Sequence, residues 1–249
     1  MRRLKIWFRI LYQFFLSMNC VRKANLLSAE QTRDIVIKEK KSLIRLGDGE
    51  LNILEGKGIH YQEANNTLQK EMGELIQYYI DKGGNCEYLL CMPNEFLKCY
   101  GTKLLKKRVW VSSWARFRYV FKKNYDRKIK YGEAFLFATK YEDVYKQIWE
   151  EKEYIIFVHN NEKYAQAFKK KYGKEVVFIK VPGQNSYQCV EEIVASIARA
   201  IGEICTHKEN GIVLLSAGPC AKTIVFRLKD IGVQIVDTGH CWDEPLALM

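Results

Sequence analysis

Two carboxylates one residue apart, Asp48 and Glu50, are the residues whose types and spacing most directly suggest chemistry. They lie in the glycine-flanked segment Gly47-Asp48-Gly49-Glu50, which directly follows residues 42–46, an expected short strand. Carboxylate oxygens suit hard divalent cations, and glycine lets a ligand approach the backbone closely. A cation held there could bridge diphosphate oxygens and stabilise the charge on a nucleotide leaving group. The same two acids also suit the first turn of a solvated helix, which is the alternative interpretation.

A second group of polar side chains follows the last expected strand, in residues 237–244. His240 could bind a metal, donate a hydrogen bond to phosphate or move a proton. Asp237, Asp243 or Glu244 could serve as a base. A histidine that is satisfied within the fold is the alternative for His240.

Two turns between a strand and a helix complete the candidate site. In residues 216–221, the turn at Gly218 could present a helix N-terminus to a phosphate. In residues 182–187, Gln184 and Asn185 could recognise a base or sugar hydroxyls. Neither G-x-G-x-x-G nor G-x-x-x-x-G-K-[ST] is present, so the dinucleotide and P-loop fingerprints are absent from the sequence. For residues 216–221 the alternative is ordinary packing of a strand against a helix. For residues 182–187 it is a turn capped by asparagine.

Alternating strands and helices are expected to position these residues. The pattern predicts strands at residues 42–46, 87–92, 134–138, 154–158, 175–181, 212–216 and 233–237. It predicts helices at residues 28–40, 66–82, 141–150, 161–172, 187–206 and 219–230, and a short one that ends at Leu54. The strands are nearly continuous apolar runs, which is typical of a parallel sheet covered on both faces. We therefore expect an α/β fold, a Rossmann-like and mostly parallel sheet, whose post-strand loops meet at one rim where ligands bind.

Length and composition agree with one domain in a reducing compartment. The chain has 249 residues, a formal net charge of +11 and eight cysteines without a C-x-x-C pair. The cysteines are expected to be buried small hydrophobes, which favours a cytoplasmic location. The positive charge suits polyanionic partners. Residues 109–131 mix aromatic and basic side chains, but no helix-turn-helix, zinc-finger or RNP pattern supports nucleic acid, and none is expected as a partner.

Residues 1–23 are predicted to form a basic amphipathic helix ahead of the domain at residues 24–249. Basic and polar side chains recur at helical spacing on one face: Arg2, Lys5, Arg9 and Gln13. Apolar side chains cover the other: Leu4, Trp7, Phe8, Leu11, Phe14, Phe15 and Met18. The pattern fits a helix in the interface of an anionic membrane. Packing on its own domain is the alternative; a signal peptide or anchor is disfavoured because Arg9 interrupts a short apolar run.

Three segments together resemble one known family. They are residues 44–50, residues 181–187, and residues 214–222 running into residues 236–240. In order and spacing they look like the GT-D fold glycosyltransferases, formerly a domain of unknown function. The similarity spans about residues 30–245. The chain departs from the family pattern at residues 158–162, at Trp242 and around residues 134–141.

The resemblance implies a UDP-sugar or similar nucleotide-sugar donor and a divalent cation, Mn²⁺ or Mg²⁺. The residues that match the family's motifs are Arg45 before the glycine, Asp48 and Glu50 in D-x-E, Asp237, Gly239 and His240 in D-x-G-H, and Glu244 beyond them. Members are associated with bacterial glycoprotein glycosylation and surface polysaccharide assembly.

The resulting hypothesis is a metal-dependent glycosyltransferase with a glycan acceptor, lipid-linked and reached from the inner face of the cell membrane. Asp48 and Glu50 would hold the metal. Donor binding would involve Arg45, Gly47, Asn185 and Gly218, and the catalytic base would be one of Asp237, His240 and Glu244. A metal-dependent phosphohydrolase and a non-catalytic basic binding module are the two alternatives.

Overall fold

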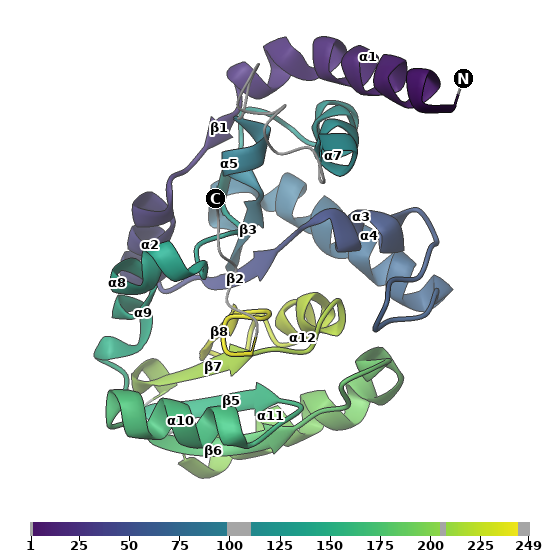
Figure 1. Cartoon of the computed structure of the whole chain (residues 1–249). Coiled ribbons are helices and arrows are strands. Elements are labelled where there is room, and N and C mark those ends of the chain that lie inside the picture. The colour runs from purple at the N-terminus through teal and green to yellow at the C-terminus, as the bar shows by residue number, and fades with distance from the viewer. Residues whose placement is uncertain (1, 99–110, 205–207, 244–249) are drawn as a thin grey trace.

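The fold is built on one parallel sheet (Figure 1). The computed structural model describes residues 2–98, 111–204 and 208–243. Its strands are β1 (Asn25–Leu26), β2 (Ser42–Arg45), β3 (Tyr88–Met92), β4 (Lys130–Glu133), β5 (Tyr154–His159), β6 (Glu175–Lys180), β7 (Gly211–Leu215) and β8 (Gln234–Asp237). They form an eight-stranded sheet in the order β1-β4-β3-β2-β8-β7-β5-β6, and every pairing is parallel. This confirms the predicted fold class.

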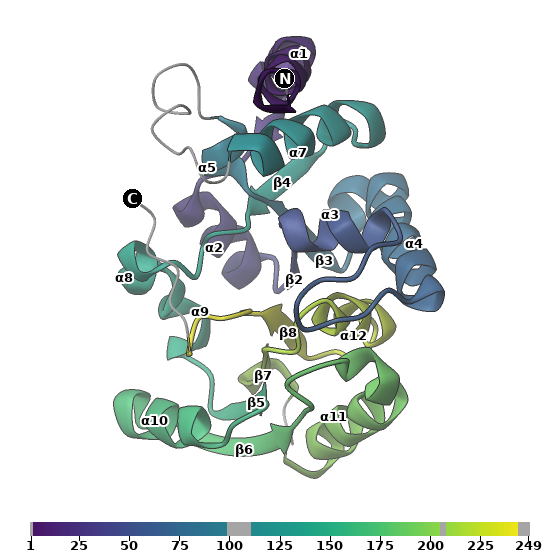
Figure 2. The ribbon, with the colours of Figure 1, turned by 45° about the vertical axis from the view of Figure 1, so that its right-hand side comes forward.

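Helices cover both faces of the sheet (Figures 1 and 2). The α-helices are α1 (Arg2–Arg22), α2 (Ala29–Lys38), α3 (Asp48–Leu54), α4 (Asn66–Lys82), α5 (Asn94–Leu97), α7 (Val111–Asn124), α8 (Glu142–Tyr145), α9 (Gln147–Glu150), α10 (Lys163–Tyr172), α11 (Val190–Ile204) and α12 (Cys220–Arg227). Helices α4, α11 and α12 lie on one face, and α2, α8, α9 and α10 on the other.

Local sequence signals fix where two of these helices begin. Ser28 and Gln31 form a capping box, in which each side chain accepts a hydrogen bond from the other's backbone N–H, and α2 starts directly afterwards. Asn65 accepts a hydrogen bond from the Leu68 N–H at 2.9 Å and caps α4. Helix α4 ends at Lys82 and is capped by Gly83, whose φ of +54° lies in the region that favours glycine.

The core lies around the central strands. Every residue of β3, β7 and β8 is buried, as are five of the six residues of β5, whereas the edge strand β6 is only partly covered. Apolar side chains on both faces of the central strands explain why these strands are continuous apolar runs in the sequence.

The prediction of a strand at residues 134–138 is wrong. Strand β4 ends at Glu133, and the chain then turns twice, through hydrogen bonds from Leu136 N to Glu133 O and from Ala138 N to Phe135 O. The turns are nevertheless packed into the core, so the segment is as apolar as a strand. The helix expected at residues 141–150 is divided into α8 and α9, and the two-residue strand β1 was not predicted.

Helix α1 has two different faces. One face packs against α7, where Ile10 meets Val111 and Ala115, and the Phe14 ring lies 4.4 Å from the guanidinium carbon of Arg118. On this face, α1 therefore packs on its own domain, which was the alternative to membrane association. Another face leaves large apolar side chains exposed, and no helix among the described residues is long and apolar enough to cross a membrane.

We expect Gly132→Ala to lower the free energy of unfolding by about 1–3 kcal/mol, because a methyl group at this position would overlap the Cys91 sulfur and lie 2.9 Å from Cγ2 of Thr32. Urea denaturation would measure the change. Gly73→Ala in α4 is the matched control: nothing lies within 4 Å of the added methyl, so this variant should be about 0.5–1 kcal/mol more stable. Equal effects of the two substitutions would contradict the packing at Gly132.

Candidate functional site

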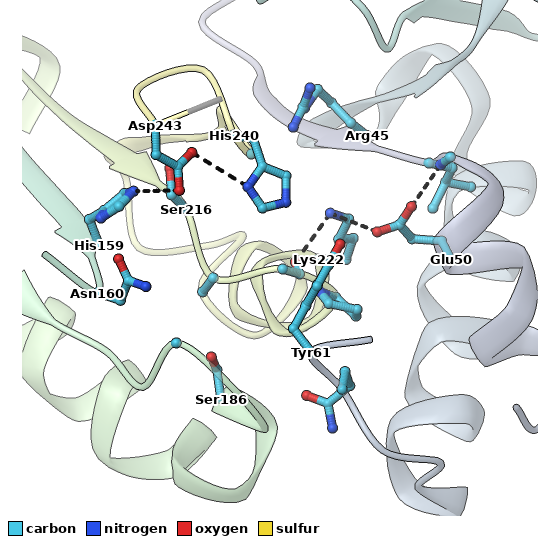
Figure 3. Close-up of a pocket in the computed structure, with 18 of the residues that line it drawn as sticks. Arg45, Glu50, Tyr61, His159, Asn160, Ser186, Ser216, Lys222, His240 and Asp243 are labelled. Atoms are coloured by element: carbon cyan, nitrogen blue, oxygen red, sulfur yellow. Dashed lines mark hydrogen bonds and ion pairs between the residues drawn. The ribbon is translucent and has the colours of Figure 1, made fainter. Parts of the chain in front are cut away.

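A pocket of about 240 Å³ lies at the carboxyl ends of the strands (Figure 3). Its wall is formed by residues at or after the ends of β2, β4, β5, β6, β7 and β8, together with Lys222 of α12 and the loop before α4. The polar members of the wall are Arg45, Glu50, Tyr61, Gln62, His159, Asn160, Ser186, Ser216, Lys222, His240 and Asp243. Ligands of open parallel sheets bind at this edge.

The side chain of Lys222 projects from α12 into the centre of the site (Figure 3). It is 4% exposed. Its Nζ lies 3.1 Å from Glu50 Oε1 and 3.0 Å from Asp237 Oδ2, and it donates a hydrogen bond to the carbonyl of Gly218 at 3.2 Å. Burial alone would lower the pKa of Lys222, but Asp237 and Glu50 outweigh it and the net pKa is raised. A fixed ammonium therefore joins two carboxylates from opposite ends of the chain.

Sequence reasoning did not single out Lys222. The available signal was its position as one charged residue among the apolar residues of a helix that begins directly behind a strand-end turn. A lysine on a buried helix face needs an anionic partner, and that requirement could have drawn attention to it.

Asp237 is fully buried at the end of β8. Its carboxylate accepts hydrogen bonds from the backbone N–H groups of Arg45 and Gly239, each at 3.2 Å, and pairs with Lys222. Burial on its own raises the pKa of Asp237, but Lys222 and Arg45 outweigh it and hold the pKa below that of a free aspartate. Asp237 is thus an ionised and fully engaged group.

The two carboxylates of the D-x-E motif have different surroundings. Glu50 is buried beside the pocket, where its Oε2 accepts a hydrogen bond from the Gly47 N–H at 2.8 Å and its Oε1 faces Lys222. Asp48 is not part of the pocket wall and interacts with the Ser113 hydroxyl of α7. Burial, followed by repulsion from Glu50, raises the pKa of Asp48. Both acids also occupy the first turn of α3, as the alternative interpretation expected.

The donor set of this motif fits a hard divalent cation. No group of three or more His, Cys, Asp or Glu side chains that could hold a metal occurs within residues 2–98, 111–204 and 208–243. Mg²⁺-like ions, however, are often held by one or two carboxylates and complete their shell with water and substrate phosphate. Asp48 and Glu50 repel one another, and a cation between them would relieve that repulsion.

Arg45 lines the pocket beside β8. Its Nη1 donates to the carbonyl of Ala134 at 3.0 Å, and its guanidinium lies 5.5 Å from the centre of the Phe137 ring. Its buried Nε has no hydrogen-bond partner among the described residues. Gly239 has a φ of +55°, and a side chain there would overlap the guanidinium of Arg45. The glycine of D-x-G-H therefore makes room for the arginine.

The structure does not bring Asn185 into the pocket wall. Asn185 adopts a left-handed conformation, with φ +52°, its side-chain oxygen accepts from the Glu63 N–H at 2.8 Å, and its own N–H donates to the Tyr61 carbonyl. It thereby holds the loop that carries Tyr61. Gly218, with φ +57°, lies under the Tyr61 ring and leaves space for it, since an added Cβ would be 2.9 Å from that ring.

The three predicted base candidates differ in access. Asp237 is enclosed, Glu244 lies outside the described residues, and the His240 side chain is 54% exposed in the pocket wall. The Tyr61 ring meets His240 edge-on, with 5.6 Å between ring centres.

We expect Lys222→Met to lower the free energy of unfolding by about 3–5 kcal/mol at neutral pH, because it leaves Glu50 and Asp237 buried without their cation. The pKa of Asp237 is lowered in the folded state, so its stabilising contribution is present above the pKa of an unfolded aspartate and is lost as pH falls. The deficit of the variant should therefore shrink as the pH is lowered through about 4.

Urea denaturation at several pH values would measure this deficit. Lys38→Met is the matched control, because Lys38 is exposed and pairs only across the surface with Asp34. Its unfolding midpoint should match that of the wild type. A Lys222→Met deficit that is equally large at pH 4 and pH 7 would contradict the ion-pair explanation.

Comparisons with known proteins identify the family. The sequence matches the family described as Glycosyltransferase GT-D fold over residues 43–245. A probable glycosyl transferase Gly of Streptococcus gordonii is 24% identical over 245 residues, which covers 90% of this chain and 33% of that protein. Glycosyltransferase GlyD of Streptococcus pneumoniae is 23% identical and is covered over 26% of its length. The chain thus spans about a third or less of the length of these curated relatives.

Solved structures show the same fold. A structure of domain of unknown function 1792, described as having a distinct glycosyltransferase fold, superposes with a TM-score of 0.75 at 22% identity, over 92% of this chain and 83% of that chain. A structure described as a new glycosyltransferase from Streptococcus sanguinis superposes with a TM-score of 0.71 at 23% identity, over 89% and 83% of the two chains. The family match covers residues 43–245, which is most of the chain and includes every segment that lines the pocket. The chain therefore belongs to the glycosyltransferase GT-D fold family.

Proposed function

We propose that this chain transfers a sugar from a UDP-sugar to a hydroxyl of a glycan acceptor, in surface polysaccharide or glycoprotein assembly. The observation that carries the proposal is the pocket at the carboxyl edge of the sheet, which Arg45, Lys222 and Glu50 line in a chain of a glycosyltransferase family. A nucleotide-sugar carries its negative charge on the diphosphate, so a site for it needs cations beside the scissile bond.

Lys222 and Arg45 are the cations that we assign to the diphosphate. Both line the pocket, and both are anchored by Asp237, so their positive charges are fixed before a donor enters. Groups fixed in advance stabilise developing charge without the cost of reorganisation during the reaction. The Nε of Arg45, which has no partner among the described residues, is a further donor at this position.

Asp48 and Glu50 are the residues that would hold Mn²⁺ or Mg²⁺. The ion, when bound, would neutralise charge on the nucleoside diphosphate as the glycosidic bond to phosphate breaks. The residues of this chain contribute two adjacent carboxylates, one of them hydrogen-bonded to the Gly47 N–H and so fixed in orientation.

We expect Asp48→Asn combined with Glu50→Gln to lower kcat/KM at least about 100-fold, because the variant removes the two negative charges that would hold the metal. The assay would follow UDP release from a panel of UDP-sugars with Mn²⁺. Glu55→Gln is the matched control: it removes a nearby acid that pairs with Arg116 outside the pocket and should leave kcat/KM unchanged. Wild-type activity in the double variant would refute the assignment, and release of inorganic phosphate without donor preference would favour a phosphohydrolase.

We further propose that α1 rests on an anionic membrane surface, on the cytoplasmic side, where a lipid-linked acceptor would be presented. The side chains of Leu4, Phe8, Leu11 and Phe15 are 60–74% exposed and recur at spacings of four, three and four residues. They therefore form one stripe on the face of α1 that does not pack on α7. Basic residues of α1 flank this stripe, which suits a helix lying among anionic headgroups.

We expect Phe8→Ser combined with Phe15→Ser to weaken binding to vesicles that contain anionic lipid by roughly tenfold or more, because two exposed aromatic side chains can no longer enter the interface. Co-sedimentation with vesicles would measure the binding. Ile37→Ser, at an exposed apolar residue of α2, is the control and should bind as the wild type does. Equal binding by all three proteins would contradict a membrane-facing α1.

A further inference from the structure

Three side chains from two strand ends form a chain of polar contacts along one wall of the pocket (Figure 3). His159 ends β5, and both His240 and Asp243 follow β8. Asp243 lies between the two rings: its Oδ1 is 3.4 Å from His240 Nδ1, and its Oδ2 is 3.8 Å from His159 Nε2. The sequence did not single out His159, and it suggested Asp243 only as a base.

The backbone fixes the tautomer of His159. Its Nδ1 accepts a hydrogen bond from the Asn161 N–H at 3.1 Å, so the proton of a neutral ring resides on Nε2, the nitrogen that points to Asp243. The side chain is 3% exposed. Burial lowers the pKa of His159 despite the nearby carboxylate of Asp243. A neutral His159 directs its Nε2–H toward Asp243, 3.8 Å away, without cancelling the negative charge of the carboxylate.

The geometry of His240 follows from the same carboxylate. With Asp243 beside Nδ1, the proton of the neutral ring is held on Nδ1, and Nε2 is left with a free electron pair. That nitrogen turns toward the interior of the pocket (Figure 3). A carboxylate that orients an imidazole in this way also stabilises the imidazolium that forms after proton transfer.

The acids Glu50, in the pocket wall, and Asp237, buried behind it, are already engaged. Glu50 and Asp237 both pair with the ammonium of Lys222, and Asp237 is also enclosed by backbone donors. Among the described lining residues, His240 therefore combines exposure, a proton-accepting atom and a separate orienting group.

We propose that His240 is the catalytic base of the glycosyl transfer, and that Asp243, held by His159, is the residue that positions it. The inference rests on the function proposed above. The acceptor hydroxyl gives its proton to Nε2 of His240 as its oxygen forms the bond to the anomeric carbon. The bond from that carbon to the phosphate oxygen breaks, and its electron pair leaves with the nucleoside diphosphate.

Charged and titratable groups surround His240 on every side. Asp243 lies at Nδ1, Tyr61 meets the ring edge-on, and Arg45 lies against the adjoining Gly239. His159 stands behind Asp243, and it repels a protonated His240 only if it is itself charged. Among these groups, Asp243 is the one acid, and its carboxylate lies 3.4 Å from Nδ1 of His240.

The test combines rate profiles with a readout that needs no turnover. UDP release from the UDP-sugar most active with the wild type is measured from pH 5 to 9, and long-range ¹H–¹⁵N NMR of the histidine rings reports their tautomers. We expect His240→Ala to lower kcat about 100-fold while UDP still raises the melting temperature. Asp243→Asn should lower kcat because the ring loses the carboxylate that orients it, and Asp243→Glu should restore most of kcat.

His159 is tested by a matched pair. His159→Gln keeps a neutral N–H donor toward Asp243 and should retain most of kcat, whereas His159→Phe should reproduce part of the Asp243→Asn effect. His60→Ala, at an exposed histidine outside the pocket wall, should leave kcat unchanged. In the NMR spectrum, we expect the Nδ1–H tautomer for His240 in the wild type and a shift toward Nε2–H in Asp243→Asn.

Several results would overturn the inference while the glycosyltransferase function stands: near wild-type kcat in His240→Ala, near wild-type kcat in Asp243→Asn, or a wild-type His240 that carries its proton on Nε2. If the wild type neither releases UDP from any UDP-sugar nor is stabilised by UDP, the proposed function itself fails. The base assignment would then fall with it, whatever tautomer is seen.

Discussion

The buried ammonium of Lys222 is the contact on which the arrangement of the site depends. It lies between Glu50, in the turn after β2, and Asp237, at the end of β8, and it comes from the helix behind β7. Strands β2 and β8 are direct neighbours in the sheet, so their carboxyl ends are adjacent although they are far apart in the chain. Two carboxylates brought this close in a buried place would repel one another, and one fixed cation between them makes the arrangement stable.

Arg45 extends this charge balance into the pocket. It shares Asp237 with Lys222, and together with Glu50 these side chains give two positive and two negative charges at one strand edge. A balanced set can stay ionised inside the protein, whereas a single unpaired charge would be expelled or neutralised. The glycines at positions 218 and 239 contribute by leaving space, one for the Tyr61 ring and the other for the guanidinium.

The opposite end of the fold is organised by apolar contacts. Helix α1 packs on α7 with one stripe of side chains and leaves a second apolar stripe without cover among the described residues. Burial of Ile10 and Ser17 anchors the helix to the domain, so the exposed stripe is held in a fixed direction. A surface helix that belongs to the folded domain would orient the pocket relative to whatever that stripe contacts.

The sequence alone predicts the parallel α/β sheet, the limits of elements such as α4, and the grouping of post-strand segments at one rim. These features depend on apolar periodicity, capping residues and glycines, which act over short distances along the chain. It could not distinguish the buried turns at residues 134–138 from a strand, because both bury apolar side chains equally well.

The contacts between side chains of the site depend on the three-dimensional fold. Lys222 lies between Glu50 and Asp237, and Asp48 interacts with Ser113. Asn185 is hydrogen-bonded to the loop that carries Tyr61. The order of strands in the sheet sets these neighbours. That order results from packing among segments distant in sequence, so no local pattern records it.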